Sequence, residues 1–474
     1  MSDNEELCWL PATELSRRIA ARELTPLDIT EAVLDRIDRI DPDLNAYVYL
    51  RPDAARAEAR QRTEEMAGGA KLGALHGIPY SVKEALHVEG TPITHGIVAN
   101  RAMVADHDEP VAARLREAGG IFLGKTNLPE GGYCANSTNH LYGATHNPWQ
   151  HGITAGGSSS GAGAAVAAGL GPIAHAADGG GSIRIPAAIN GVVGFKPSLG
   201  RVPILAMPNR FLTFAFHGPI ARTVGDAALM LNVMAGYDPA DPLSLPTEEV
   251  DYLAACDRRI AGARIAWSPD LGIAEVDPEI RAICEQAVSA FTEIGCAVES
   301  AAPQWSDPAR VMWEAVWTPT YSAMLDATDW DAQAGQVDEQ FVEVMRAGER
   351  LTVRQVQRAD AERGRMVDQF NAFMGDFDFL ITPTTTMPSH PVHEFCPAPL
   401  REAPLREQLL GWLLTYPFNL VPAPAITVPA GFTSAGLPVG LQIVGRMRAD
   451  ADVLAAAAAF ERLRPWAQHR PVLA

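Results

Sequence analysis

Residues 156–186, in the middle of the chain, are mostly glycine, alanine and serine, and they constrain the fold more than any other segment. Two loops rich in glycine and serine enclose a predicted helix over Gly161–Leu170 and a strand within the sequence GPIAHAAD. Because most side chains of that helix are hydrogen atoms or methyl groups, neighbouring backbone segments can approach it closely. The segment therefore predicts a tightly packed helix and strand that end in sharp turns.

Short apolar runs alternate with helical patterns around this segment. Ile78–Lys83, Ile121–Leu123 and Ile173–Ala177 are typical of buried strands, and Pro110–Glu117 has helical spacing. This alternation indicates an α/β fold, for which we expect one central mixed β-sheet covered by helices on both faces. The other predicted elements are helices from Thr25–Pro26 to a stop at Asp41–Pro42, at Asp53–Met66, Thr223–Ala235 and Asp277–Ile294, and strands at Arg264–Trp267, Phe379–Thr382 and Ile426–Val428.

The chain of 474 residues contains no internal repeat and no linker long enough to mark a domain boundary. Hydrophobic residues make up 47% and charged residues 20%, a globular composition with enough apolar side chains for a large core. We therefore expect a single domain over residues 1–474. Residues 307–373 are nearly all helical in pattern, and we expect them to form a helical layer over one edge of the sheet, where substrate specificity could be built.

Charge and cysteine spacing limit the partners of the chain. The 57 Asp and Glu residues outnumber the 38 Lys and Arg residues, and a formal net charge of −19 repels phosphate backbones and anionic lipids. We therefore expect neither nucleic acid nor membrane as a partner. The six cysteines are scattered without a C-x-x-C pair, and the N-terminal segment lacks a signal-peptide pattern. These features predict a cytoplasmic protein without a disulfide framework or a zinc site.

Three glycines precede Ser182 at the predicted turn from strand to helix. The N–H groups of Gly179, Gly180 and Gly181 can point into one concavity and stabilise an oxyanion, beside a serine placed to attack a carbonyl carbon. Two other interpretations stay open at this point. Glycine-rich turns also bind phosphate, although no G-K-[ST] follows the first loop and the second loop does not match G-x-G-x-x-G. A lone GGGS sequence is most often a structural turn.

A serine nucleophile needs a base, and lysine is the better candidate in this chain. Ser182 does not lie in a G-x-S-x-G nucleophile elbow, and His175 lies on a predicted strand among small residues. Lys83 ends the apolar run GIPYSVK, and burial can lower the pKa of a lysine from about 10.4 toward neutrality, so that the neutral amine accepts a proton. A surface lysine is the alternative, and Lys125 and Lys196 compete for the role. The sequence identifies no partner for the other histidines considered, which are His76, His87, His95, His140, His151 and His217.

Several motifs together resemble the amidase signature family. Residues 156–187 match the signature pattern position by position, opening with Gly-Gly-Ser-Ser-Ser-Gly and closing with Asp-x-Gly-Gly-Ser-Ile-Arg-x-Pro. GIPYSVKE, GKTNLPE and GATHNPW resemble further motifs of the family, and TYPFNLVPAPAITVPAGF and GLPVGLQIVG resemble its C-terminal strands. The resemblance covers nearly the whole chain. It is weakest at residues 237–376, which we expect to be a more variable, largely helical part of the same domain.

The resemblance implies a Ser-cisSer-Lys triad that needs no metal and no organic cofactor. By motif, Ser182 matches the nucleophile, Ser158 the bridging serine that follows a cis peptide bond, and Lys83 the base. It also implies supporting roles for Ser159 as a hydrogen-bonding group, for Asp178 and Arg184 in holding the glycine turn, and for Gly132, Tyr133 and Cys134 along the acyl side of the substrate site.

The expected function is hydrolysis of small, mainly apolar carboxamides to a carboxylic acid and ammonia or an amine, through an acyl-enzyme on Ser182. One alternative is an amidotransferase subunit that hydrolyses glutamine for tRNA-dependent amide formation. Another is a non-catalytic binding protein on the same fold, and a homodimer is left open for either. Trp313, Trp317 and Tyr321 lie in the helical region, where aromatic residues are more often core than pocket.

Overall fold

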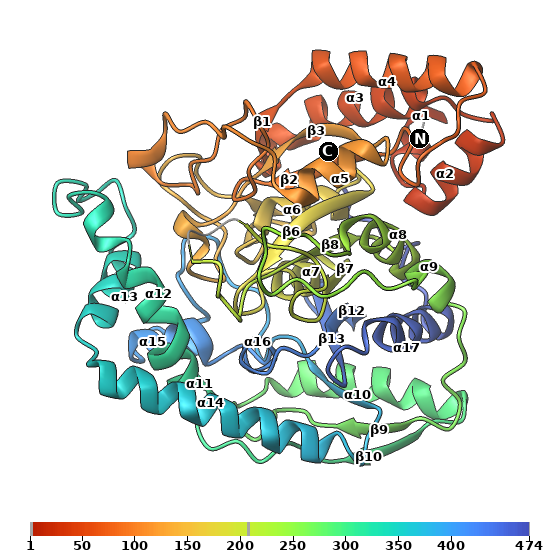
Figure 1. Ribbon diagram of the computed structural model, residues 1–474. Coiled ribbons are helices and arrows are strands. Elements are labelled where there is room, and N and C mark those ends of the chain that lie inside the picture. Colours follow the sequence, from red (N-terminus) through yellow and green to blue (C-terminus); the bar gives the residue numbers. More distant parts are fainter. Residues whose placement is uncertain (1–2, 206–208, 474) are drawn as a thin grey trace.

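The computed structural model describes residues 3–205 and 209–473 (Figure 1). The strands are β1 (Tyr47–Leu50), β2 (Pro79–Lys83), β3 (Ile121–Thr126), β4 (His146–Asn147), β5 (Gln150–Thr154), β6 (Ile173–Asp178), β7 (Val193–Lys196), β8 (Phe216–Ala221), β9 (Arg264–Trp267), β10 (Ala297–Ser300), β11 (Phe379–Pro383), β12 (Ala425–Phe432) and β13 (Pro438–Gly445). The helices are α1 (Asp3–Leu7), α2 (Ala12–Ala20), α3 (Pro26–Leu44), α4 (Pro52–Ala67), α5 (Pro110–Glu117), α6 (Ser160–Ala167), α7 (Arg184–Asn190), α8 (Val224–Met234), α9 (Tyr252–Ala255), α10 (Pro278–Glu293), α11 (Pro308–Val311), α12 (Thr318–Ser322), α13 (Glu339–Glu349), α14 (Val353–Phe373), α15 (Leu405–Leu410), α16 (Pro417–Leu420) and α17 (Asp450–Leu463), with a π-helical turn at Met312–Trp317.

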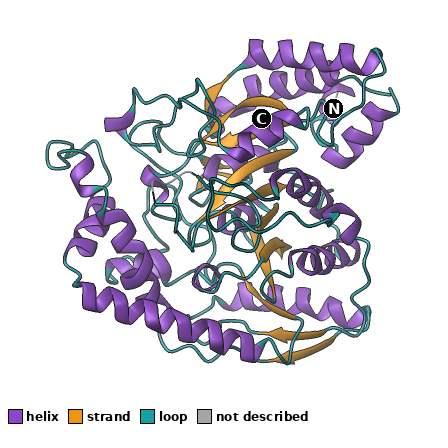
Figure 2. Cartoon of the chain, viewed as in Figure 1, coloured by secondary structure: helices purple, strands orange, loops and turns teal. Residues whose placement is uncertain are grey.

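One mixed sheet runs through the molecule, with helices against both of its faces (Figure 2). Its strand order is β1-β3-β2-β6-β8-β7-β12-β13-β11-β9-β10, and β4 and β5 form a separate hairpin. β2 is parallel to β3 and β6, β9 is parallel to β10 and β11, and the remaining neighbours are antiparallel. The expected α/β class with a central mixed sheet is confirmed.

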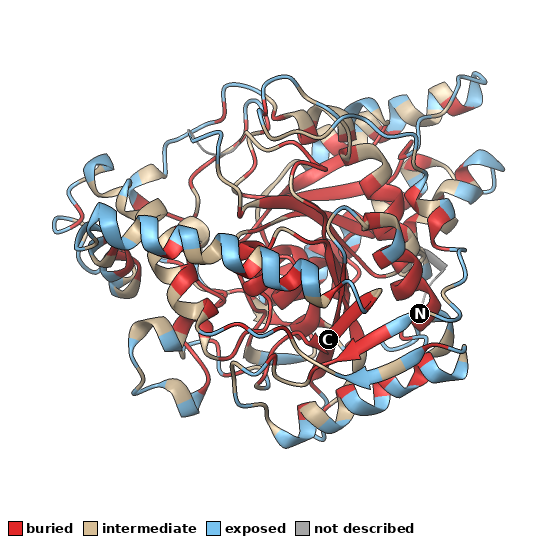
Figure 3. Ribbon diagram, turned by 60° about the horizontal axis from the view of Figure 1, so that its bottom comes forward, coloured by how far each residue is buried: buried red, intermediate tan, exposed pale blue. Residues whose placement is uncertain are grey.

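The two faces of the sheet bury different side chains because a strand alternates its side chains with a period of two. On β13, Leu441 and Ile443 join the large apolar cluster that includes Phe291 of α10 and Phe460 of α17, whose rings stack 5.5 Å apart. Gln442, between these two residues, faces the opposite side, where α7 packs. Figure 3 shows the buried residues gathered in the sheet and in the helices packed on it.

The small-residue helix α6 is buried along its whole length. A β-carbon on Gly161 would lie 2.1 Å from the carbonyl oxygen of Ala46, and one on Gly163 would lie 2.8 Å from the side-chain nitrogen of Asn190. Larger residues at these positions would therefore push the neighbouring backbone away. The tight packing predicted for this segment is confirmed, and it fixes the loop that begins α6.

Helix α3 begins where the sequence predicted but ends later than predicted. Thr25 caps α3 through its hydroxyl oxygen, which accepts the N–H of Asp28 at 3.1 Å. The predicted stop at Asp41–Pro42 is wrong, because the helix continues to Leu44 and ends at Asn45, whose φ is 55°. Only two helical residues, Asp43 and Leu44, follow Pro42 before the helix ends.

The helical region lies over a face of the sheet rather than over its edge. Its helices α11 to α14 are all present, as predicted (Figure 1). Their apolar side chains share a cluster with Ala266 of β9, Leu380 of β11 and Val444 of β13, whereas the edge strand β10 is mostly exposed or half-buried. Within the described residues, no helix is both long enough and apolar enough to cross a membrane.

Candidate active site

The two glycine- and serine-rich loops lie side by side. The N–H of Ser159 donates to the carbonyl oxygen of Ser182 at 3.1 Å, and the Ser159 hydroxyl donates to the carbonyl oxygen of Ala177 at 3.2 Å. The peptide bond between Gly157 and Ser158 is cis, as expected. Ser159 thus ties the loop that carries Ser158 to the turn that carries Ser182.

Lys83 reaches Ser158 from the end of β2. Its Nζ donates to Ser158 Oγ at 2.7 Å, and its side chain is buried. Burial lowers the pKa of Lys83 to about 7, although the nearby Asp178 carboxylate favours the charged form. A substantial fraction of Lys83 is therefore uncharged at neutral pH and can exchange a proton with the Ser158 hydroxyl.

The competing bases point elsewhere. Lys125 donates to the carbonyl oxygen of Leu86, and Lys196 donates to the carbonyl oxygens of Pro197 and Ala423. His175 and His217 pair with each other through ring nitrogens 3.0 Å apart. Of the histidines in the described ranges, none lines the cavity beside Ser182.

Ser182 opens onto a small cavity. Among the described residues, no charged side chain lines it, and its walls are Tyr133, Cys134, Ala135, Gly157, Gly180, Ser182, Ile185, Trp317, Leu409, Leu410 and Leu413. Burial raises the pKa of the Cys134 thiol, so this residue is an uncharged wall group rather than a thiolate. Within the part of the chain that the structure describes, the hydroxyls of Ser182 and Ser158 are not hydrogen-bonded to each other.

The predicted wall residues are placed unequally. Tyr133 and Cys134 line the cavity, whereas Gly132 does not. Gly132 lies instead beside the bridging serine, since a β-carbon there would be 3.2 Å from Ser158 Oγ. Trp317 also lines the cavity, which corrects the expectation that it is only a core residue, while Trp313 is partly buried in the core outside the lining.

Hydrogen bonds fix the helical region to the loop that carries Tyr133. Trp317 Nε1 donates to the carbonyl oxygen of Tyr133 at 3.2 Å, and the Tyr321 hydroxyl donates to that of Gly131 at 3.1 Å. The Tyr133 hydroxyl in turn donates to Asp338 Oδ2 at 2.7 Å. The π-helical turn therefore contributes Trp317 to the cavity wall, and α12 is fixed to the same loop through Tyr321.

Asp178 holds the glycine turn in shape. Its Oδ1 accepts the N–H of Gly181 at 2.7 Å, and its Oδ2 accepts the N–H of Ile183 at 3.2 Å. Gly181 has a φ of 133°, and a β-carbon on it would lie 2.1 Å from Thr415 Oγ1, so only glycine fits. The N–H groups of Gly179, Gly180 and Ser182 have no hydrogen-bond acceptor among residues 3–205 and 209–473.

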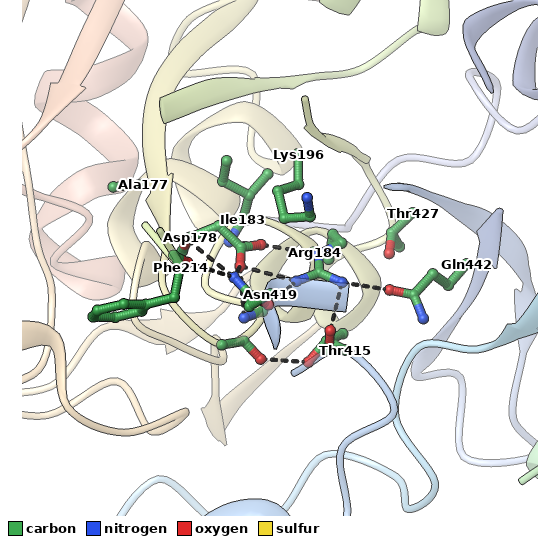
Figure 4. Close-up of polar contacts among 12 residues, drawn as sticks. Ala177, Asp178, Ile183, Arg184, Lys196, Phe214, Thr415, Asn419, Thr427 and Gln442 are labelled. Atoms are coloured by element: carbon green, nitrogen blue, oxygen red, sulfur yellow. Dashed lines mark hydrogen bonds and ion pairs between the residues drawn. The ribbon is translucent and has the colours of Figure 1, made fainter. Parts of the chain in front are cut away.

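A buried network behind the turn holds Asp178 in place (Figure 4). Arg184 donates to both carboxylate oxygens of Asp178 at 2.9 Å, and also to Gln442, Asn419 and the carbonyl oxygen of Thr415. Burial alone would raise the pKa of Asp178, but the Arg184 guanidinium and the Asn419 amide hold it at about 2. The carboxylate is therefore charged throughout the neutral range.

Three members of this network were not predicted from the sequence. The Thr415 hydroxyl donates to the carbonyl oxygen of Gly180 at 2.7 Å, and the Asn419 amide donates to Asp178 Oδ1 at 2.8 Å. Together with Gln442, they lie in the C-terminal motifs TYPFNL and LQIVG. Isolated polar residues within apolar, buried segments were the signal that could have identified them.

Comparison with known proteins gives consistent matches over almost the whole chain. The family model for amidases matches residues 28–454. An acylamidase of Rhodococcus erythropolis is 49% identical over 98% of this chain and 98% of its own length. A glutamyl-tRNA(Gln) amidotransferase subunit of Chloroflexus aggregans is 33% identical over 99% of both chains.

The fold gives the same result. The crystal structure of a bacterial aryl acylamidase of the amidase signature enzymes superposes with a TM-score of 0.90, at 33% identity and over 97% of each chain. Matches of this length and identity extend well beyond the signature segment. The chain therefore belongs to the amidase signature family and is an amidase, an enzyme that hydrolyses amide C–N bonds.

Proposed function

We propose that this amidase hydrolyses N-acylated amines and related small carboxamides whose acyl group is apolar. The observation that carries the proposal is the cavity beside Ser182, whose walls include Trp317, Ile185 and three leucines and no charged side chain. Such a cavity favours an aryl or short aliphatic group over a polar one. The similarity to an acylamidase and to an aryl acylamidase supports the same substrate class.

In the proposed acylation step, the proton moves away from Ser182 through Ser158. Neutral Lys83 accepts the proton of the Ser158 hydroxyl, to which it is hydrogen-bonded at 2.7 Å. Ser158 accepts the proton of Ser182, and Ser182 Oγ attacks the amide carbonyl carbon. Hydrogen bonds between catalytic groups are often long before substrate binds, and we expect the contact between the two serines to tighten on binding.

The developing oxyanion is stabilised by backbone N–H groups of the glycine turn. Gly181 contributes differently from its neighbours, because its N–H is already donated to Asp178. The donors proposed for the oxyanion are therefore those of Gly179, Gly180 and Ser182. Each such donor contributes about 3–4 kcal/mol to transition-state stabilisation.

The tetrahedral intermediate then breaks its C–N bond. Ser158 gives a proton to the leaving nitrogen, because an unprotonated amine leaves poorly, and Lys83 returns its proton to Ser158. Water attacks the acyl-enzyme with the same groups acting as base, and the carboxylic acid leaves Ser182 free. The wall residues Tyr133 and Cys134 would hold the acyl group during both steps.

Glutamine is a poor fit to this cavity. A free glutamine carries an ammonium group and a carboxylate, and both need charged or strongly polar partners when they are buried. In the part of the chain that the structure describes, the lining offers no charged side chain for either group. We therefore favour amide hydrolysis over the amidotransferase function. A non-catalytic role is the least favoured of the three, because Lys83 is held in a form that can accept a proton.

We also propose a cytoplasmic location. The six cysteines are buried, and no disulfide joins any two of them in the described ranges, which suits a reducing compartment. A small amide substrate is the partner that the site supports.

Ammonia or amine release from a panel of amides tests the proposed substrate class. N-acyl anilines and short aliphatic amides should be hydrolysed with a higher kcat/KM than glutamine, and Ser182→Ala should hydrolyse none of them. Faster hydrolysis of glutamine than of every N-acyl aniline would reject the proposal.

A further inference from the structure

A second group of chemically active side chains lies at the base of the loop between β2 and α5. His87 follows β2, and Asp106 and His107 precede α5. One ligand atom from each of the three residues can be chosen so that all lie within 4.8 Å of one another. From this geometry we propose that His87, Asp106 and His107 bind a divalent transition-metal cation such as Zn²⁺.

The three side chains already face one another. The imidazole rings of His87 and His107 stack with centroids 4.7 Å apart and planes 25° from parallel. His107 Nδ1 and Asp106 Oδ1 are 2.7 Å apart, within hydrogen-bonding distance. Two imidazoles and a carboxylate form a ligand set that Zn²⁺ uses with water in its fourth position.

The adjustment falls on exposed side chains, because the imidazole planes of His87 and His107 are nearly parallel and one ring must turn before both can present a nitrogen to the same ion. Ligands about 2.0–2.1 Å from a tetrahedral Zn²⁺ are roughly 3.4 Å from one another, so atoms now 4.8 Å apart must move about 1.4 Å. The side chains of Asp106 and His107 are 89% and 51% exposed and can move without disturbing the core. His87 is half-buried and supplies the fixed ligand.

The cation would connect the two ends of the loop between β2 and α5, and the middle of this loop contacts the active site. The N–H of Gly90 donates to the carbonyl oxygen of Ala105, the residue before Asp106. Farther along the loop, the carbonyl oxygen of His95 accepts the N–H of Gly131. The next residue, Gly132, lies beside the Ser158 side chain. None of the three ligands lines the cavity of Ser182, so the ion would stabilise the loop and take no part in the reaction.

Metal titration of the tag-free protein, freed of metal with EDTA and dialysed, tests this site. Isothermal titration with Zn²⁺ and visible absorption with Co²⁺ should show one ion per chain. His87→Ala and His107→Ala should each weaken binding by at least about tenfold. The matched control is His151→Ala, which removes one ring of the His146–His151 stack, where the rings are 3.9 Å apart, and it should leave the affinity unchanged.

Thermal unfolding provides the second measurement. Because a ligand that binds only the folded state stabilises it, Zn²⁺ should raise the melting temperature of the wild type and of His151→Ala, but not of His107→Ala. The melting temperatures in EDTA verify that all three proteins fold. Absence of saturable binding, equal affinity in His107→Ala and wild type, or loss of binding in His151→Ala would each overturn the proposal.

Discussion

The pH dependence of turnover should follow the titration of Lys83. Burial lowers the pKa of this side chain from the usual 10.5 to about 7, which corresponds to about 5 kcal/mol against the ammonium form. Because only the neutral amine can accept the proton of Ser158, kcat/KM should follow the neutral fraction. That fraction is about one-tenth at pH 6 and about nine-tenths at pH 8, so kcat/KM should rise about tenfold between them and then level off.

Initial rates of p-nitroacetanilide hydrolysis, followed by the absorbance of p-nitroaniline from about pH 5 to about pH 10, measure this profile. Lys83→Met keeps the length of the side chain without the amine, and it should lose turnover at every pH. A kcat/KM that continued to rise about tenfold per pH unit beyond pH 9 would mean an ordinary lysine with its usual pKa. If kcat/KM of Lys83→Met still rose with pH around pH 7, the base would be a histidine instead.

Three substitutions test the surroundings of the triad. Arg184→Met leaves the Asp178 carboxylate buried without its cation, and it should lower the free energy of unfolding in urea by about 3–5 kcal/mol, whereas a change below about 1 kcal/mol would mean that the network contributes little. Trp317→Leu enlarges the cavity and should lower kcat/KM for N-acetyl anilines by roughly tenfold or more while favouring amides of bulkier acids. Unchanged selectivity would place Trp317 outside the substrate site. Cys134→Ser should keep kcat within a few-fold of the wild type, and loss of turnover comparable to that of Ser182→Ala would make the thiol the nucleophile.

Local sequence patterns predicted helices and strands well where the deciding interactions join residues close together in the chain. Thr25 caps α3 with the N–H of Asp28, three residues away, and the apolar run that ends at Lys83 is β2. The prediction at Pro42 was wrong because a proline usually marks the end of a helix, whereas α3 continues for two residues beyond it. Ser158 and Lys83 are 75 positions apart, so their contact was expected from the resemblance to a family and from no local pattern.

Contacts across long separations were beyond the sequence alone. Arg184 donates a hydrogen bond to Gln442, 258 positions away. The role of Gln442 could not be predicted from the sequence, because it depends on β13 lying beside α7 in the folded chain. The sequence favours a core position for Trp317 because it is large, apolar and in a helical segment, and its place in the cavity depends on its hydrogen bond to Tyr133. Burial of Lys83 beside Ser158, which gives the lysine its altered pKa, is likewise a property of the folded chain.

Mass spectrometry after reaction with a fluorophosphonate measures directly whether Ser182 becomes acylated. The intact wild type should gain one phosphonyl group, peptide mapping should place that group on Ser182, and Ser182→Ala should stay unmodified under the same conditions. A phosphonyl group on any other residue, or equal modification of the two proteins, would contradict an acyl-enzyme formed at Ser182.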